Sequence, residues 1–364
     1  DGFGAGSDVL GSHNTSSGGY AGMSVTGSNN DAYGFTSGQS VSGSLNSAQG
    51  YGAGSNVIGS KNVATGSGAG TQVSGLGNAA TGSYAGQNVT GSYNNASGTY
   101  AGQNVTGSYN SASGAYAGQN VSGDGNLATG LSAGISVTGD RNNASGSNAG
   151  QTVSGDGNIA TGFAAGIGVT GDENSASGTY SGRSVSGSFN VASGARSGQS
   201  VTGNYNSGFG TNAGISVSGD FNIAVGESAA SGVTGNHNSA IGRNAGDTVV
   251  GDNNASYGTG SGVSVSGGDN VAVGHDSGML VTGDRNNAIG NNAGYSVSGN
   301  NNDSFGANAG QNISGSFNTS SGTRSGSSVT GSNNASYGTG SGVSVSGGDN
   351  VAVGHDSGML VTGD

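Results

Sequence analysis

Carboxylates spaced sixteen residues apart are the side chains with the most obvious chemistry. They are Asp124, Asp140, Asp156 and Asp172. If each interval formed one coil of a stacked structure, neighbouring carboxylates would lie about 5 Å apart. Like charges at that spacing repel one another, and a bound cation such as Ca²⁺ would relieve the repulsion. Asp is also favoured in exposed turns, so we expect a solvated acidic edge and keep a calcium row as the alternative hypothesis.

Catalytic groups are sparse in the rest of the chain. The four histidines are far apart in the sequence, there is no Cys, and no phosphate-loop Lys follows a Gly-rich segment. We therefore expect neither an enzyme nor a resident cofactor. Lys and Arg number seven against a formal net charge of −12, so nucleic acid is not an expected partner. No apolar run is long enough to predict membrane insertion in this segment.

The whole chain follows one sixteen-residue register. Written in rows of sixteen from Asp1, its 364 residues give 22 full rows and a partial one, with no insertion. Numbering each row 1 to 16, positions 2 and 11 are always Gly, and position 14 is Asn in every full row. Position 9 is Val except at Ile313, and positions 5 and 16 are mostly Ala or Ser. We interpret residues 1–364 as a single continuous repeat domain and a section of a longer repetitive protein.

This repeat predicts an all-β fold rather than helices. Each of the 82 Gly residues would cost a helix roughly 1 kcal/mol relative to Ala. Two short strands per turn, closed by Gly, fit better and predict a β-solenoid, or β-roll, of about 23 turns. We expect inward side chains at Val89, Val105 and Val121. At the corners we expect left-handed Asn residues whose amides form a ladder, including Asn94, Asn110 and Asn126.

Position 1 changes character along the chain. It is mostly Ser or Thr through residue 193, after which seven successive repeats carry an apolar residue. If these side chains point outward, they form a stripe about 30 Å long that would be an oligomer interface. If they point inward, the second half has a larger core; both alternatives remain open. The residues are Phe209, Val225, Ile241, Tyr257, Val273, Ile289 and Phe305.

Two further surface rows suggest ligands. Tyr84, Tyr100 and Tyr116 share position 4, where an aromatic row could bind sugars but is better explained as protection of a loop. Positions 8 and 10 flank the Val with Ser, Thr and Asn, and a flat hydroxylated face of this kind resembles that of ice-binding solenoids. A polar outer face on any strand would give the same pattern.

Some segments resemble a known class of surface protein. "NSAIGRNAG" (238–246), "NVAVGHDSG" (270–278) and "NNAIGNNAG" (286–294) resemble repeats of trimeric autotransporter adhesin heads, and are similar to bacteriophage tail-fibre shafts. The resemblance implies a β-roll with three chains side by side, exposed on a surface and binding a host, a matrix or another cell. This chain differs in its longer repeat and in lacking the coiled-coil stalk and membrane anchor.

The sequence therefore predicts an extracellular fibrous structural protein or adhesin at a cell surface. We expect it to self-associate as a homotrimer or filament and to bind host, matrix or cell-surface ligands through many weak contacts. A bacteriophage tail-fibre shaft and an ice-binding β-solenoid are the alternatives.

Overall fold

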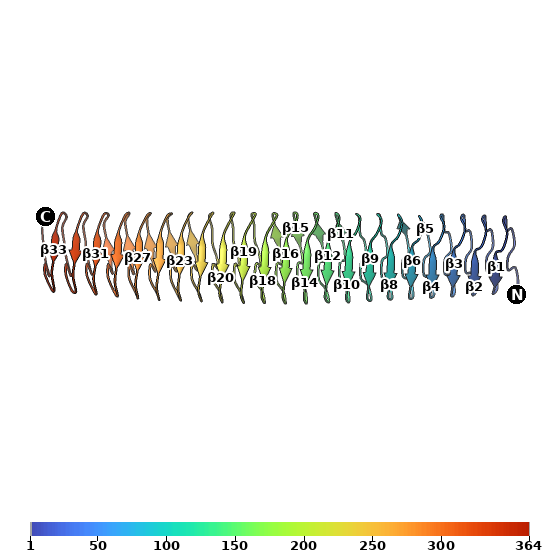
Figure 1. The fold of residues 1–364 in the computed structure, drawn as a ribbon, viewed down its shortest axis with the longest axis horizontal. Helices are drawn as coiled ribbons and strands as arrows, with labels where there is room; N and C mark the ends of the chain where they lie inside the picture. The colour runs from blue at the N-terminus through green and yellow to red at the C-terminus, as the bar shows by residue number, and fades with distance from the viewer. Residues whose placement is uncertain (1, 364) are drawn as a thin grey trace. The chain divides into compact units, whose positions relative to one another are not determined.

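Each coil of the chain contains one three-residue strand, one shorter extended segment and two loops that contain Gly. The computed structural model describes residues 2–363. The chain divides into unit 1 (Asp1–Ser184) and unit 2 (Val185–Asp364). Within each unit, successive coils lie side by side (Figure 1). The described residues form no helix, and so none that could cross a membrane.

In unit 1, eleven three-residue strands occupy positions 15, 16 and 1 of successive repeats and pair into a long sheet. They are β1 (Thr15–Ser17), β2 (Asp31–Tyr33), β3 (Ser47–Gln49), β4 (Val63–Thr65), β6 (Ala79–Thr81), β8 (Asn95–Ser97), β9 (Ser111–Ser113), β10 (Leu127–Thr129), β12 (Asn143–Ser145), β14 (Ile159–Thr161) and β16 (Ser175–Ser177). Two-residue strands at positions 9 and 10 form the second side of the coil. They are β5 (Val73–Ser74), β7 (Val89–Thr90), β11 (Val137–Thr138), β13 (Val153–Ser154) and β15 (Val169–Thr170).

Unit 2 repeats this arrangement with another eleven three-residue strands. They are β18 (Val191–Ser193), β19 (Ser207–Phe209), β20 (Ile223–Val225), β21 (Ser239–Ile241), β23 (Ala255–Tyr257), β25 (Val271–Val273), β27 (Asn287–Ile289), β29 (Asp303–Phe305), β31 (Thr319–Ser321), β32 (Ala335–Tyr337) and β33 (Val351–Val353). Its two-residue strands are β17 (Val185–Ser186), β22 (Val249–Val250), β24 (Val265–Ser266), β26 (Val281–Thr282), β28 (Val297–Ser298) and β30 (Ile313–Ser314).

Strands pair in parallel with a register of sixteen residues. Ala80 of β6 lies opposite Ala96 of β8, and Ile241 of β21 lies opposite Tyr257 of β23. Where the second side has no labelled strand, a single parallel bridge at position 10 continues the pairing, as between Thr90 and Thr106. This architecture confirms the predicted all-β solenoid. It makes about 21 turns rather than the predicted 23.

The core of each coil is thin. Position 9 supplies one buried Val, and positions 5 and 16 supply two small residues, usually Ala. In the coil of Val105, Ala101 is fully buried and Ala112 is 5 % exposed. One Val and two Ala per sixteen residues contribute little apolar burial against the conformational entropy of the backbone. Coil-to-coil hydrogen bonds must therefore supply much of the stability.

The invariant Gly residues are explained by how closely successive coils approach. Gly91 at position 11 has a φ of 135°, and Gly98 at position 2 has a φ of 134°. A Cβ on Gly91 would overlap the carbonyl oxygen of Gly107 in the next coil, and one on Gly98 would overlap that of Gly114. Any other residue at these positions would both strain the backbone and separate the coils.

Left-handed residues do not lie where the sequence predicted. Position 14 was expected to be the left-handed corner, but none of its Asn residues has a positive φ among the described residues. Left-handed conformations occur instead at positions 4, 8 and 13, as in Tyr84 (57°), Asn88 (56°) and Tyr93 (59°). The chain turns one residue before the Asn, which leaves the Asn backbone ready to enter the strand.

Candidate functional site

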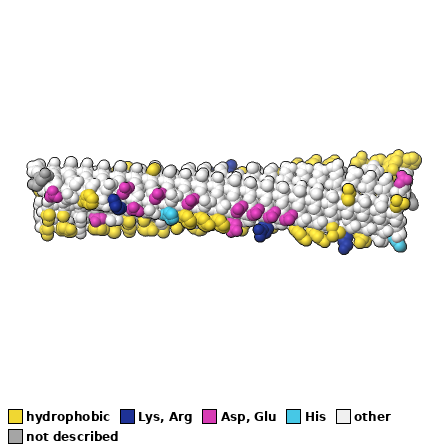
Figure 2. All heavy atoms as spheres, turned by 90° about the horizontal axis from the view of Figure 1, so that it is seen from above, with side chains coloured by type: hydrophobic (Ala, Val, Ile, Leu, Met, Phe, Trp, Pro, Cys, Tyr) yellow, Lys and Arg dark blue, Asp and Glu magenta, His cyan; other side chains and the backbone are white. Residues whose placement is uncertain are grey.

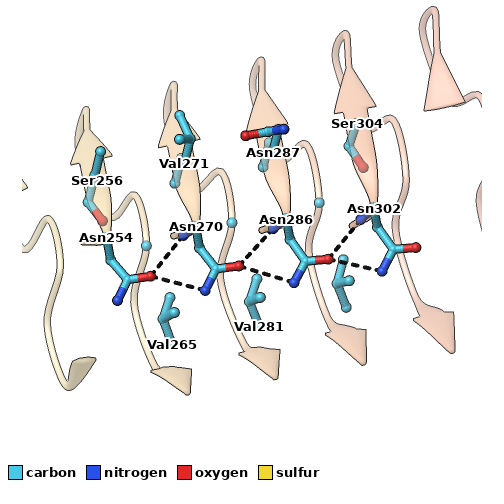
Figure 3. A pocket seen from close by; sticks show the side chains of 17 residues that line it. Asn254, Ser256, Val265, Asn270, Val271, Val281, Asn286, Asn287, Asn302 and Ser304 are labelled. Carbon is cyan, nitrogen blue, oxygen red and sulfur yellow. Dashed lines mark hydrogen bonds between the residues drawn. The ribbon is translucent and has the colours of Figure 1, made fainter. Parts of the chain in front are cut away.

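The Asn residues at position 14 form buried ladders along the coils. Figure 3 shows four rungs in unit 2, with each amide pointing toward the next along the stack. The Asn270 amide nitrogen donates to Oδ1 of Asn254 (3.0 Å) and to the carbonyl of Gly283 (2.9 Å). Oδ1 of Asn270 accepts from the backbone N–H (2.9 Å) and the amide (3.1 Å) of Asn286. The side chain of Asn270 therefore makes four hydrogen bonds.

The same ladder runs through unit 1, where it includes the three Asn residues singled out from the sequence. The backbone N–H of Asn110 donates to Oδ1 of Asn94 (3.0 Å), and that of Asn126 donates to Oδ1 of Asn110 (2.9 Å). Val89, Val105 and Val121 point into the same coils and are 3 to 4 % exposed. These residues form the frame, which leaves specific recognition to the outward positions.

The four Asp residues belong to a second ladder, at position 12. The backbone N–H of Asp124 donates to Oδ1 of Asp140 (2.8 Å), and the N–H of Asp140 donates to Oδ1 of Asp156 (2.8 Å). The N–H of Asp156 donates in the same way to Asp172. Acidic side chains are visible in rows on the face drawn in Figure 2. One oxygen of each carboxylate therefore has a structural role that the sequence did not suggest.

Other residue types replace these Asp residues without loss of the contact. Ser44 accepts the N–H of Ser28 through Oγ (3.0 Å), and Asn204 accepts that of Ser188 through Oδ1 (2.8 Å). A side-chain oxygen, rather than a negative charge, is thus what makes this contact, and Leu76 and Gly268 show that position 12 also accepts residues without one. No group of three or more acidic, His or Cys side chains among residues 2–363 is arranged to hold a metal ion. Calcium binding by the row remains a prediction.

The long sheet presents two different outer faces. In unit 1, eight successive coils carry a hydroxyl at position 1, and all but the half-buried Ser145 are exposed: Thr65, Thr81, Ser97, Ser113, Thr129, Ser145, Thr161 and Ser177. In unit 2, the apolar stripe occupies the same position, and six of its seven side chains are 37 to 44 % exposed. Val273 is half-buried. Strand alternation places position 1 outward because Ala or Ser at position 16 points inward.

Aromatic rows follow two of the left-handed positions. Tyr84, Tyr100 and Tyr116 stack at position 4 with ring centroids 5.2 and 5.3 Å apart. In unit 2, position 13 carries Phe189, Tyr205, Phe221 and His237, stacked at 4.8 to 5.0 Å with interplanar angles of at most 8°. Sequence reasoning missed this second row, although its recurrence every sixteen residues was a visible signal. Within each row the rings cover one another's faces and expose mainly their edges.

Stacked rings are poorly suited to binding sugars, which pack against open aromatic faces. The rows instead shield backbone at the corners. In unit 1 the amide of Gln103 reaches the carbonyl of Tyr84 (2.9 Å) and Oε1 of Gln87 (3.0 Å), so a Gln row adjoins the Tyr row.

Comparisons with known proteins do not identify a relative. No protein-family model matches the chain, and no curated protein matches it. The resemblance to adhesin heads and tail fibres therefore extends to the β-solenoid architecture and not to a shown family.

Proposed function

We propose that the protein is an extracellular fibrous structural protein or adhesin that forms a surface fibre or filament. The observation that carries this proposal is the coil-to-coil ladder: backbone pairing, the position 14 amides and the position 12 acceptors all join one coil to the next. Such bonding favours long stacks, because each added coil makes the same stabilising contacts as the coil before it. A long stack of coils presents an extended surface, which suits a spacer or a protein that binds through many weak contacts.

Adhesion would use the outward positions, where side chains vary while the frame stays fixed. Weak contacts repeated along one fibre add through avidity, so no single deep site is required. The partners we propose are other copies of the chain and host, matrix or cell-surface ligands.

Electron microscopy combined with a light-scattering mass tests the fibrous role. We expect thin fibres or filaments of uniform width. Globular particles, or a chain that circular dichroism shows to be disordered, would overturn the proposal. Antibody labelling of intact source material then separates the two settings: labelled cell surfaces support an adhesin, whereas labelled virus particles support the alternative of a tail-fibre shaft.

Ice binding is a second candidate because unit 1 exposes hydroxyl rows. Position 10 carries exposed Thr90 and Thr138 on the short strands and exposed Thr106 at a single bridge, and position 1 carries the longer row. Position 8 does not extend this face as expected, because its left-handed residues, such as Asn88, lie outside the strand. Shaping of ice crystals by the purified protein would support this candidate, and growth of unmodified crystals would exclude it.

A further inference from the structure

We propose that the outer face of the long sheet in unit 2 binds the same face of a second copy, with the two solenoid axes parallel. This face, called the unit 2 face below, consists of positions 15 and 1 from Ser207 to Tyr337. The inference rests on the proposed fibrous function and specifies the partner and geometry of its chain-chain contact.

The unit 2 face has the composition of an interface core. Among its described residues, Asp303 is the only charged one, and its Oδ1 already accepts a hydrogen bond from the amide of Asn287 (2.7 Å). The seven side chains of the stripe expose roughly 500 Å² together, taking about 200 Å² for a full aromatic side chain. Ile223 and Val271 at position 15, and Tyr337 at position 1, add to the exposed apolar area of the face. The total approaches about 800 Å², which is the area each partner buries in a standard interface.

Residue sizes along the face are complementary within each coil. Where position 1 is aromatic, position 15 is small or polar: Phe209 accompanies Ser207, Tyr257 accompanies Ala255, Phe305 accompanies Asp303, and Tyr337 accompanies Ala335. Where position 1 is only Val, position 15 is also apolar and of similar size, as in Ile223 with Val225 and Val271 with Val273. These six coils thus combine a ridge with a shallow side or carry two moderate side chains, whereas the coil of Thr319 and Ser321 carries two small polar ones.

That pattern selects one symmetry. A two-fold axis along the stacking direction reverses the strands of one copy and places its position 1 opposite position 15 of the other, at the same coil. Phe209 would then cover Ser207 of the partner subunit, and Tyr257 would cover Ala255 of the partner subunit. A two-fold axis along the strands would instead oppose position 1 to position 1, aromatic against aromatic or Ile. It would also oppose position 15 to position 15, where small side chains facing one another would leave gaps. The two-fold axis along the stacking direction therefore gives an isologous contact in which the position 1 row of each copy covers the position 15 row of the other.

A second copy also matches the face in its period. Coils recur at the parallel-strand spacing of about 4.8 Å, and only a surface with the same spacing can repeat a contact over nine successive coils. The unit 1 face has this spacing too, but its hydroxyls remain well hydrated and gain little from burial. Pairing of one unit 2 face with another is therefore favoured over mixed pairing.

Charge substitution tests whether this face associates. Ile241→Lys places an ammonium at the centre of the apolar stripe, and Thr81→Lys makes the matched change at position 1 of unit 1. By analytical ultracentrifugation, we expect Ile241→Lys to weaken self-association by at least about tenfold. Thr81→Lys should leave it within about twofold of the unchanged protein. If both variants self-associated as strongly as the unchanged protein, the proposal would be overturned.

A milder variant guards against misfolding. The melting curve of Ile241→Lys, followed by circular dichroism, should match that of the unchanged chain. If it does not, Ile289→Thr is tested in place of Ile241→Lys. Thr65 and Thr81 show that the frame accepts Thr at position 1. Weaker association of Ile289→Thr supports the interface, and unchanged association counts against it.

Cross-linking tests the orientation. The chain has no Cys, so introduced thiols react alone. In a mixture of a Ser239→Cys chain and a size-tagged Ile241→Cys chain, a short bismaleimide should join the two variants. Preferential linkage of Ile241→Cys to Ile289→Cys would instead indicate antiparallel copies and overturn the proposed symmetry. If dimers cross-link as expected but micrographs show no fibres, the fibrous function fails while this interface stands.

Discussion

Units 1 and 2 share one frame but present different outer faces. Both contain the Asn ladder, the buried Val of position 9 and Gly residues through which adjacent coils approach closely. Position 1 of the long sheet is nevertheless a row of hydroxyls in unit 1 and an apolar stripe in unit 2. The same backbone therefore carries two surfaces, and functional differences between the units must come from outward side chains.

Variation is confined in this way because the frame accepts few changes. Ser replaces Ala at buried position 5, as at Ser261, where its hydroxyl donates to the carbonyl of Gly258 (3.0 Å). Outward positions meet no such requirement, since solvent solvates whichever side chain is present. The comparison predicts that frame substitutions act alike in both units, whereas face substitutions act in only one.

The largest effect should follow from a charge in the core. Val105→Asp in unit 1 and Val281→Asp in unit 2 each bury a carboxylate without a partner, and we expect each to destabilise its surrounding coils by at least about 4 kcal/mol. Hydrogen exchange and denaturant unfolding measure the loss. Val105→Ile is the control, because Ile313 occupies the same position, and should change stability by less than about 1.5 kcal/mol. Tolerance of the Asp in one unit alone would refute a common frame.

Removal of one ladder amide should have the next largest effect. Asn110→Ala deletes a side chain with three hydrogen bonds, and Asn270→Ala deletes one with four. Each change leaves a buried backbone N–H in the next coil without its acceptor. A loss of about 3 kcal/mol is expected in both units. Asn95→Ala, at an exposed strand position, is the matched control and should change stability by less than about 0.5 kcal/mol. Equal losses for Asn95 and Asn110 would show that the ladder contributes nothing specific.

A smaller effect distinguishes the two roles of the acidic row in unit 1. Asp140→Asn keeps an oxygen for the N–H of Asp124, so stability should stay within about 0.5 kcal/mol, whereas Asp140→Ala should lose about 1 kcal/mol. Melting curves with and without calcium complete the test. A calcium-dependent rise in the melting temperature of the unchanged chain that Asp140→Asn abolishes would assign the row a cation. If calcium leaves the melting temperature unchanged, the row has only the structural role of accepting backbone N–H groups.

How much the sequence could predict depended on what repeats. The register, the parallel stacking and the inward Val follow from strict recurrence, which only a coil-by-coil stack explains. The outward direction of the stripe could not be decided, because Ile241 and Val105 are equally apolar and only the strand phase separates them. The acceptor role of Asp140 was missed for another reason: it depends on a backbone N–H sixteen residues earlier, at an angle that no local pattern encodes.

Left-handed residues were misplaced for a related reason. Asn is the residue most tolerant of that conformation, so position 14 was the natural choice. Tyr and Thr occupy left-handed positions instead, because the geometry of the coil determines where the chain turns, whichever residue type is at that position. Stacking against the neighbouring coil, as between Tyr84 and Tyr100, offsets part of the cost.

The smallest predicted effect measures that cost directly. Thr152 in unit 1 and Thr248 in unit 2 are β-branched residues with φ of 56° and 59° at position 8, where Gly168 and Gly232 also occur. Thr→Gly should relieve about 1 to 2 kcal/mol of backbone strain and lose part of it to the greater freedom of the unfolded chain, for a net gain of about 0.5 kcal/mol. Thr90→Gly, at an extended position, should instead lose about 1 kcal/mol. Denaturation midpoints that rise for both position 8 variants and fall for Thr90→Gly would show that one strained frame underlies both faces, whereas a rise in one unit alone would mean that the two frames differ.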